Sequence, residues 1–332
     1  MSYAPISFDY DTHGHATLAG FSVKDLAQTH GTPVYIMDQA TIEKNCRDFM
    51  DTLSHAYPTF KVLYASKANI NIGLLQLIHR QGLQLDVSSG GELYTAIKAG
   101  VPPQEIYFHG NNKTPDELTL AISHNVTLML DNTHELDHIL SIIKTAPPAS
   151  PLRIMLRLNP NIEAHTHDYI KTGQLDSKFG LAKDQLLPLA TQIHAHPHLD
   201  FVGIHSHIGS QIFDVSPYED LVHVLMEMVQ LLHDHSLPLK ELNIGGGMGI
   251  CYTVKDSPPP IQAFIQQVST LIQSEFSQRN IPLPTLLVEP GRAIVGNAGI
   301  TLYRVGAIKE IEGIKTSSPF FNLFFLYGLI KH

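Results

Sequence analysis

The sequence predicts an α/β fold built on a (β/α)8 barrel, and two observations lead to this prediction. Eight short apolar or β-branched runs lie between residues 61 and 290, and amphipathic stretches with helical spacing separate them. Polar side chains recur at or just beyond the C-terminal ends of these runs, as expected where the ends of barrel strands share one face. A doubly wound open sheet is the alternative architecture.

The predicted strands follow one another at regular intervals. They cover residues 61–66, 83–89, 105–110, 126–132, 152–160, 199–209, 240–247 and 284–290. Helical patterns lie between them, for example at 91–100, 115–125, 133–145, 218–235 and 261–276. The polar residues at the strand ends, which would face one barrel mouth, are Lys67, Asp86, Ser88, His109, Asn111, Asp131, Arg157, His205, His207, Gly245–Gly247 and Glu289.

The flanking segments predict a second, β-rich domain formed by both ends of the chain. A short helix and the strand-like run 33–38 precede the barrel, and residues 298–311 alternate like a strand that leaves it. We therefore expect an N-terminal segment 1–38 that contributes to the β domain, a barrel at 39–292, and the start of a C-terminal β domain at 293–332.

Composition narrows the possible partners. Lys and Arg total 22 against 31 Asp and Glu, and no basic run could follow a phosphate backbone, so we expect no nucleic-acid partner. The apolar run 320–330 is shorter than the roughly 20 residues that cross a bilayer, so we expect no membrane partner. The N-terminus lacks signal-peptide features and the only cysteines, Cys46 and Cys251, make no disulfide framework, which favours the cytoplasm. The 20 histidines form no HExxH or CxxC-type site, so we expect no metal.

Lys67 ends an apolar run in the stretch YASKAN at 64–69. A lysine partly shielded from water at a barrel mouth has a lowered pKa, and its neutral amine can form a Schiff base with a carbonyl. An ordinary ion-pair partner is the alternative interpretation of a single lysine at a strand end.

The glycine-rich stretch NIGGGMG at 243–249 follows a predicted strand. Its glycines would expose successive backbone N–H groups, an arrangement that holds a phosphate. A tight turn is the alternative, although three consecutive glycines are more than a turn needs.

Glu289 ends the eighth strand in the stretch VEPGR at 288–292. An acid in this place can keep a pyridine nitrogen protonated, and a protonated ring stabilises a carbanion. An ion pair with Arg157 or Arg292 is the alternative role.

His205 and His207 are two residues apart on a predicted strand, so they would face the same way. One of them could lie flat on an aromatic cofactor ring. A metal pair without a third ligand and a hydrogen-bonded interior histidine are the alternatives. Together, an amine, a phosphate cradle, an acid and a flat side chain predict a site for pyridoxal phosphate (PLP).

Several motifs resemble one known family in their order and spacing. The motifs are YASKAN, DVSSGGEL, FHGNNK, HIGSQI, GGGMGI and EPGRAIVGNAG, and the match runs from about residue 30 to about residue 312. They resemble the fold type III PLP-dependent decarboxylases, and diaminopimelate decarboxylases in particular. Ornithine and arginine decarboxylases share several of these motifs but differ at HGNNK (109–113) and YASKAN, and carboxynorspermidine decarboxylases diverge around the arginine of EPGR.

The resemblance implies a role for each matching residue. Lys67 would bind the cofactor covalently, His207 would stack on its ring, and Glu289 would pair with the ring nitrogen. Arg292 would bind a substrate carboxylate, and Lys178-Phe179-Gly180 resembles a loop that lies over the site. The phosphate would be held by Ser210, Gly245, Gly246 and Gly247, with backbone contacts from Glu289, Pro290, Gly291 and Arg292. Asp86 would border the cofactor. Asp86 and Arg157 would also orient Lys67 and Glu289, and the remaining supporting residues would be Ser88 and Glu92.

The implied reaction is loss of CO2 from the D-configured carbon of meso-2,6-diaminopimelate, which gives L-lysine in the last step of lysine biosynthesis. The family resemblance also implies a homodimer. The tail TSSPFFNLFFLYGLIKH (316–332) lacks the turn residues, the Asp and the Cys-Glu pair that family members carry. We therefore expect a truncated or frameshifted C-terminus and an incomplete β domain. A catalytically silent PLP-binding barrel and a fragment without function are the alternatives.

Overall fold

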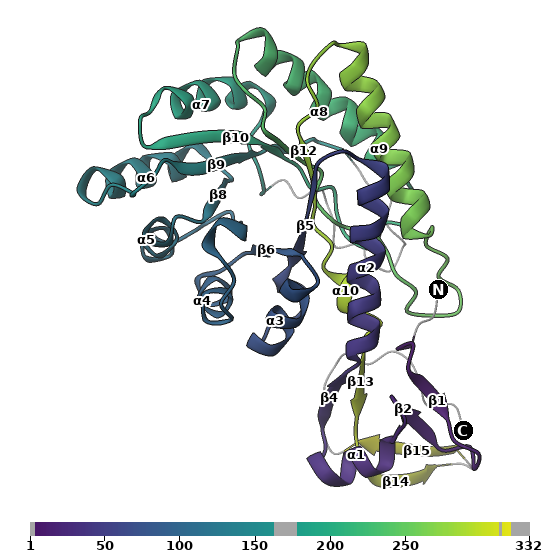
Figure 1. Cartoon of the computed structure of the whole chain (residues 1–332). Helices are drawn as coiled ribbons and strands as arrows, with labels where there is room; N and C mark the ends of the chain where they lie inside the picture. Colours follow the sequence, from purple (N-terminus) through teal and green to yellow (C-terminus); the bar gives the residue numbers. More distant parts are fainter. Residues whose placement is uncertain (1–3, 163–177, 312–313, 320–332) are drawn as a thin grey trace.

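The structure, a computed structural model, describes residues 4–162, 178–311 and 314–319. Figure 1 shows a barrel surrounded by helices, with a smaller β-rich unit beyond the N-terminal end of α2 (Gln39–Ala56). Within the described residues, no helix is both long and apolar enough to cross a membrane.

Eight parallel strands close into a barrel in the order β10-β11-β12-β5-β6-β7-β8-β9. The predicted barrel is therefore confirmed, and the open-sheet alternative is wrong. The strands are β5 (Phe60–Ala65), β6 (Gln84–Val87), β7 (Ile106–Phe108), β8 (Thr127–Leu130), β9 (Leu152–Arg157), β10 (Leu199–His205), β11 (Glu241–Asn243) and β12 (Thr285–Val288). The strands end earlier than predicted, because the last residues of each predicted strand are no longer paired with a neighbouring strand and form the loops of the mouth.

Helices follow the strands around the outside of the barrel (Figure 1). Ser89 accepts a hydrogen bond from the backbone N of Glu92, and Thr114 forms a capping box with Glu117, so short polar residues after two strands start the next helices. Besides α2, the helices of the barrel are α3 (Ile72–Arg80), α4 (Gly90–Lys98), α5 (Pro115–His124), α6 (Thr133–Thr145), α7 (Lys183–Ala195), α8 (Ser216–Asp234), α9 (Ile261–Gln278) and the short α10 (Arg292–Val295), with 3-10 turns η1 (Ser66–Ala68) and η2 (Pro103–Glu105).

Alternation along the strands divides the side chains between two cores. Outward residues such as Val62, Leu85 and Ile154 belong to the large core against the helices. The inward residues form a separate apolar cluster in the lumen, made of Leu63, Tyr107, Met129, Met155, Val202 and Leu287. Inward positions nearer either strand end are polar, so the lumen has a polar layer on each side of the apolar one.

The flanking segments form antiparallel sheets, as predicted for a β-rich second domain. β4 (Val34–Met37) pairs with β13 (Gly299–Leu302), so the segments directly before and after the barrel meet in one sheet. The others are a sheet of β1 (Phe8–Tyr10), β2 (Ala16–Leu18) and β3 (Phe21–Ser22) and a hairpin of β14 (Val305–Ile311) and β15 (Ile314–Pro319), with α1 (Val23–His30) beside them. The domain boundaries at 38 and 292 stay a prediction, and the tail from 320 lies outside the described residues.

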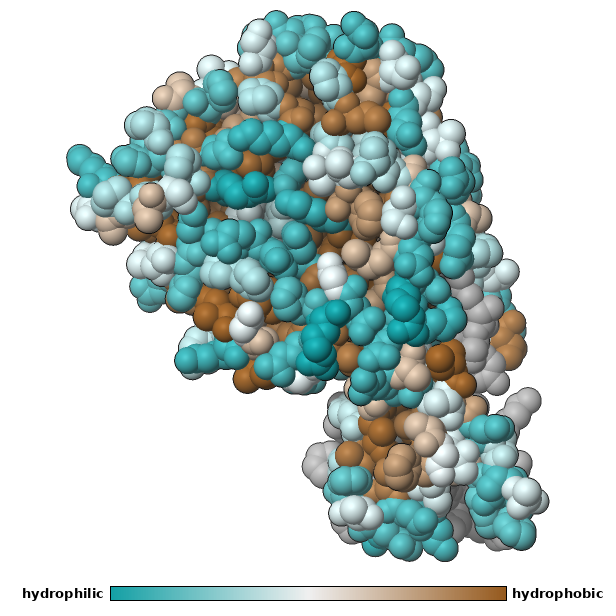
Figure 2. Space-filling model, viewed as in Figure 1, coloured by the Kyte–Doolittle hydropathy of each residue, from teal (hydrophilic) through white to brown (hydrophobic). Residues whose placement is uncertain are grey.

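Apolar side chains lie open on this smaller unit, which carries a brown surface in Figure 2. Tyr10, Phe21 and Tyr35 are 63%, 65% and 72% exposed. A neighbouring groove of about 460 Å³ is lined mostly by apolar residues, including Leu18, Phe21, Leu26, Ile36 and Met37. Exposed apolar surface of this kind is a common feature of contact surfaces in proteins.

Candidate active site

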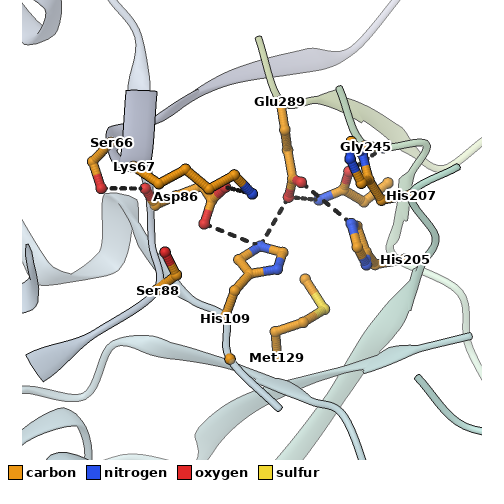
Figure 3. Close-up of polar contacts among 12 residues, drawn as sticks. Ser66, Lys67, Asp86, Ser88, His109, Met129, His205, His207, Gly245 and Glu289 are labelled. Carbon is orange, nitrogen blue, oxygen red and sulfur yellow. Dashed lines mark hydrogen bonds and ion pairs between the residues drawn. The ribbon is translucent and has the colours of Figure 1, made fainter. Parts of the chain in front are cut away.

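Lys67 and Asp86 approach each other at the ends of neighbouring strands (Figure 3). Lys67 lies in η1 directly after β5, and its Nζ is 3.8 Å from Oδ2 of Asp86 on β6. Asp86 is 1% exposed, neither of its carboxylate oxygens has a hydrogen-bond partner among the described residues, and burial raises its pKa. The Lys67 side chain is 58% exposed, so the shielding from water that we expected is not present.

Glu92 fixes the backbone next to Lys67. Its Oε2 accepts a hydrogen bond from Oγ of Ser66 at 2.7 Å and another from the backbone N of Ser88 at 2.9 Å. The Oγ of Ser88 lies 3.1 Å from the same oxygen. Because Ser66 precedes Lys67 in η1, Glu92 ties the position of the lysine to the loop after β6.

Glu289 follows β12 and is almost fully buried at the mouth. Its Oε1 lies 2.9 Å from Nε2 of His109 and accepts a hydrogen bond from Nδ2 of Asn243 at 2.7 Å; its Oε2 lies 3.2 Å from Nε2 of His205. Burial alone would raise the pKa of Glu289, but His109 and His205 hold it well below its usual range. The carboxylate is therefore kept ionised inside the protein.

Arg157 makes different contacts from those expected. Its Nη1 lies 3.8 Å from Oδ1 of Asp131, and its guanidinium lies 4.4 Å from the ring centroid of Phe179. Glu289 takes its described contacts from His109, His205 and Asn243 instead, so the expected orientation of Glu289 by a direct contact from Arg157 is not what the structure shows. The physical reason is register, because β9 places Arg157 beside His205, whereas Glu289 reaches the mouth from β12.

The stretch Lys178–Gly180, which resembles a loop that covers the site, is held by Asp131 and Asn111. The backbone N of Gly180 donates to Oδ2 of Asp131 at 3.1 Å, and Nδ2 of Asn111 donates to the carbonyl of Lys178 at 3.3 Å. Gly180 has φ +80°, and a Cβ there would lie 2.7 Å from a backbone nitrogen of Asn159. The preceding residues 163–177 lie outside the described residues.

His205 and His207 contact different groups although they are two residues apart. His205 is fully buried against Glu289, and burial lowers its pKa to about 4. His207 lies beyond the end of β10, where its Nδ1 accepts a hydrogen bond from the backbone N of Gly246 at 3.3 Å. Removal from water and the nearby charges of Lys67 and Arg157 lower the pKa of His207 well below its usual range.

The three glycines of the glycine-rich loop each meet a steric demand. A Cβ at Gly245 would lie 2.7 Å from the carbonyl of Ser206, and a Cβ at Gly246 or Gly247 would collide with the carbonyl of Glu289 or of Gly209. Gly245 and Gly247 also have φ of +72° and +106°. The run of three glycines therefore lets the loops after β10, β11 and β12 touch through their backbones.

Arg292 joins two of these loops. Its Nη1 donates to the hydroxyl of Tyr252 at 2.9 Å, and its Nη2 donates to Oγ of Ser210 at 3.1 Å. The adjoining Pro290 accepts a hydrogen bond from the backbone N of Ala65 at 3.1 Å, which ties the EPGR loop to the strand before Lys67. A cation thus stands beside Ser210, where the resemblance places a phosphate.

Sequence reasoning placed His109 at the mouth but gave it no role, and it missed Asn243. The signal was present in the period of two along β7 and β11, which turns both side chains into the lumen. One ring nitrogen of His109, one of His205 and one oxygen of Glu289 all lie within 4.8 Å of one another. This set of three atoms could hold a metal ion. This set differs from the His205 and His207 pair that we considered, and its members already pair with one another.

The site residues fit PLP in their chemistry. The exposed amine of Lys67 suits an aldehyde, and the buried anion of Glu289 suits a protonated ring nitrogen. Asp86 and Nδ1 of His205 are buried polar groups without hydrogen-bond partners among the described residues, as expected of a pocket built around a polar ligand. The backbone of the glycine loop and Arg292 lie where a phosphate needs donors and positive charge.

Comparisons with known proteins agree with this chemistry. Residues 39–296 match the family described as "Pyridoxal-dependent decarboxylase, pyridoxal binding domain". The chain is 41% identical over 321 residues to the diaminopimelate decarboxylase of Synechocystis sp., covering 94% of this chain and 68% of the relative. It is 39% identical over 307 residues to that of Bacillus subtilis, covering 91% and 70%.

Solved structures give the same family. The diaminopimelate decarboxylase of M. jannaschii in complex with L-lysine superposes with a TM-score of 0.84 at 30% identity, covering 96% of this chain and 74% of that one. The enzyme of Helicobacter pylori, also complexed with L-lysine, gives 0.78 at 28%, covering 89% and 72%. The barrel, the mouth residues and these similarities together show that this chain belongs to the diaminopimelate decarboxylase family of PLP-dependent decarboxylases.

Proposed function

We propose that this chain is a carbon-carbon lyase that uses PLP to decarboxylate meso-2,6-diaminopimelate to L-lysine and CO2. The names of the relatives and the L-lysine bound in two similar structures support this substrate and product. The observation that carries the proposal is that one barrel mouth holds both an exposed amine, Lys67, and a buried carboxylate, Glu289, which its neighbours keep ionised.

The side chains around the ring position have defined tasks. When bound, PLP supplies a conjugated ring that takes up the electron pair left by CO2. Lys67 would hold the cofactor by condensing with its aldehyde, with loss of water, and Asp86, 3.8 Å from Nζ, would stabilise a positive charge on that nitrogen. Glu289, as an anion, holds a proton on the ring nitrogen, and His207 orients the ring by lying against it.

The two ends of the ligand need anion-binding groups. We propose that the backbone of Gly245–Gly247, the EPGR loop and Ser210 hold the phosphate. Arg292, already beside Ser210 and Tyr252, offers a guanidinium that can bind a substrate carboxylate through two parallel hydrogen bonds. The residue types at these positions are those that bind anions, which supports the assignment.

Two other functions are kept as alternatives. A catalytically silent barrel would bind PLP through Lys67 without turning over an amino acid, and a chain without a stable fold would do neither. The alternative substrates are a basic amino acid or carboxynorspermidine, as in the related decarboxylases. The HGNNK stretch at 109–113 favours diaminopimelate over both.

Replacing Lys67 tests the proposal. We expect purified protein with PLP to show an absorbance band near the visible range and to release CO2 from meso-diaminopimelate but not from L-ornithine or L-arginine. Lys67→Ala should lose the band and lower CO2 release by a factor on the order of 1,000 or more, because it removes the amine that we propose binds the aldehyde. Lys98→Ala, at an exposed lysine, is the matched control.

The outcomes separate the alternatives. A band that depends on Lys67 without CO2 release would indicate the silent barrel. Release from L-ornithine in preference to meso-diaminopimelate would assign another substrate class. Folded wild-type protein without any band would contradict both PLP-based functions.

We also propose that the chain acts as a homodimer in the cytoplasm. The exposed apolar side chains of the smaller unit, among them Phe21 and Tyr35, support a contact between copies, and two free cysteines suit a reducing compartment. Light scattering should give a molar mass near twice that of one chain, and a monomer at micromolar concentration would contradict the dimer.

A further inference from the structure

His109 lies between the two carboxylates of the mouth. Its Nε2 is 2.9 Å from Oε1 of Glu289 and 3.6 Å from Oδ1 of Asp86, and the side chain is 5% exposed. Figure 3 shows the resulting chain of contacts, which runs from Lys67 through Asp86 and His109 to Glu289 and on to His205. Five barrel strands contribute to it at their C-terminal ends, namely β5, β6, β7, β10 and β12.

His109 acts electrostatically on the two carboxylates beside it. Glu289 is ionised and therefore accepts hydrogen bonds without donating them. Nε2 of His109 lies within ion-pair distance of this anion, although no aligned hydrogen bond joins the two atoms. Asp86 has no hydrogen-bond partner among the described residues, and the charge of His109 when protonated favours the ionised form of Asp86.

The position of His109 is fixed from several directions. Its backbone N donates to the carbonyl of Val87 at 2.7 Å, which continues the pairing of β7 with β6. Its ring forms a T-shaped, edge-to-face contact with the ring of His205, with centroids 4.9 Å apart and an interplanar angle of 78°. The loop after it is clamped by Lys113, a 1% exposed side chain whose Nζ donates to the carbonyls of Gly110 and Met129 and lies 2.5 Å from Oε1 of Glu135.

We propose that His109 is a positioning residue that couples the two ends of the cofactor site. It holds Glu289 in the place where the ring nitrogen binds, and through Asp86 it supports the positive charge at Lys67. This inference rests on the proposed roles of Lys67 and Glu289 and adds a link between them. Loss of His109 should therefore affect both the binding of PLP and the protonation of the nitrogen that Lys67 contributes.

The charged groups around this link are few and identifiable among the described residues. Lys67 and Asp86 lie on one side of His109, Glu289 and His205 on the other. Arg157, on β9, acts on His205 and His207 from the neighbouring wall of the mouth. A test must therefore separate an effect through His109 from a general change in the charge of the site.

The test uses the absorbance band of PLP attached to Lys67, and its readouts are the dissociation constant of PLP and the pH midpoint of the band. His109→Phe keeps the size of the ring and removes the donor. We expect PLP to bind about tenfold more weakly, because Glu289 loses the polar group that lies 2.9 Å from its carboxylate. We expect the midpoint to fall by about one pH unit, because Asp86 loses a charge that favours its ionised form. His109→Gln, which keeps an N–H donor, should restore PLP binding to within about threefold of wild type.

Two further variants make the link itself measurable. The double variant His109→Phe with Glu289→Gln should bind PLP no more than about twofold more weakly than Glu289→Gln alone, because His109 acts through Glu289. Lys113→Met is the control for damage to the loop, and it should lower the melting temperature of the protein without moving the pH midpoint.

Three results would overturn the proposal. They are His109→Phe protein that is folded by circular dichroism and matches wild type in both readouts, losses that add fully in the double variant, and a midpoint that moves as far in Lys113→Met as in His109→Phe. These results are distinct from failure of the proposed reaction, which would appear as absence of CO2 release while the band of the wild type persists. Wild-type protein without the band would overturn the Lys67 assignment and this proposal together.

Discussion

The two ends of the barrel lumen carry polar layers of opposite character. At the N-terminal end, Glu241 lies 2.6 Å from both Nζ of Lys61 and Nη2 of Arg153, and the hydroxyl of Tyr107 donates to it. These four side chains satisfy one another. At the C-terminal end, Asp86 and Nδ1 of His205 are buried without hydrogen-bond partners among the described residues.

The difference teaches where function lies in this fold. A buried polar group costs free energy unless it is paired, so a self-satisfied layer stabilises the barrel and closes one end. A layer with unpaired groups is stable only because the rest of the fold supports it, and its groups become paired when a polar ligand enters. Gln84, which has one unpaired buried oxygen near the closed end, departs from this pattern without carrying a charge.

Removing the anion of the closed end should have the largest effect on stability. Glu241→Ala leaves Lys61 and Arg153 without their carboxylate, and we expect a loss of about 3 kcal/mol in the free energy of unfolding. Affinity for PLP per folded molecule should stay within about twofold of wild type, since the closed end does not touch the cofactor. Urea unfolding and a PLP titration measure the two quantities; a large loss of affinity without a loss of stability would contradict the comparison.

A methyl group in the glycine loop should perturb the open end by a smaller amount. Gly247→Ala places a Cβ against the carbonyl of Gly209 at a φ of +106°, so we expect a loss of about 2 kcal/mol and weaker binding of PLP. Gly100→Ala is a matched control, because Gly100 has φ +84° and no heavy atom within 4 Å of the position that the new methyl group would take. It should cost about 1 kcal/mol from backbone strain alone and leave PLP binding unchanged. Equal losses in the two variants would contradict a role for close contact between the loops.

Acid should affect the open end through His205. Burial lowers its pKa to about 4, whereas an unfolded histidine titrates near about 6.5, so the folded state favours the neutral ring. Its contribution to stability is present above about 6.5 and is lost as the pH falls toward 4, because the unfolded state takes up the proton first. We expect about 1 to 2 kcal/mol less stability at pH 5 than at pH 7 in cofactor-free protein. His205→Gln should reduce this pH dependence in urea unfolding, and an undiminished dependence would assign it to other groups.

The mouth residues could be named from the sequence to different degrees. Lys67, Asp86, His207 and Glu289 could be placed together because each lies near the C-terminal end of a predicted strand, and a closed parallel barrel brings all these ends to one face. Their partners could not be chosen in this way. Arg157 was expected near Glu289, but neighbouring register and the ring of Phe179 place it with Asp131.

The sequence by itself determined the eight strands, the alternation of inward and outward residues, and the set of side chains at the mouth. These follow from local periods of two and of about 3.6 residues, which are readable along the chain. Only the tertiary structure decided that His109 bridges Asp86 and Glu289 and that three glycines are needed for contact between loops. The physical reason is that barrel closure brings together residues as far apart in sequence as Asp86 and Glu289, and the three-dimensional positions of their side chains select the partners.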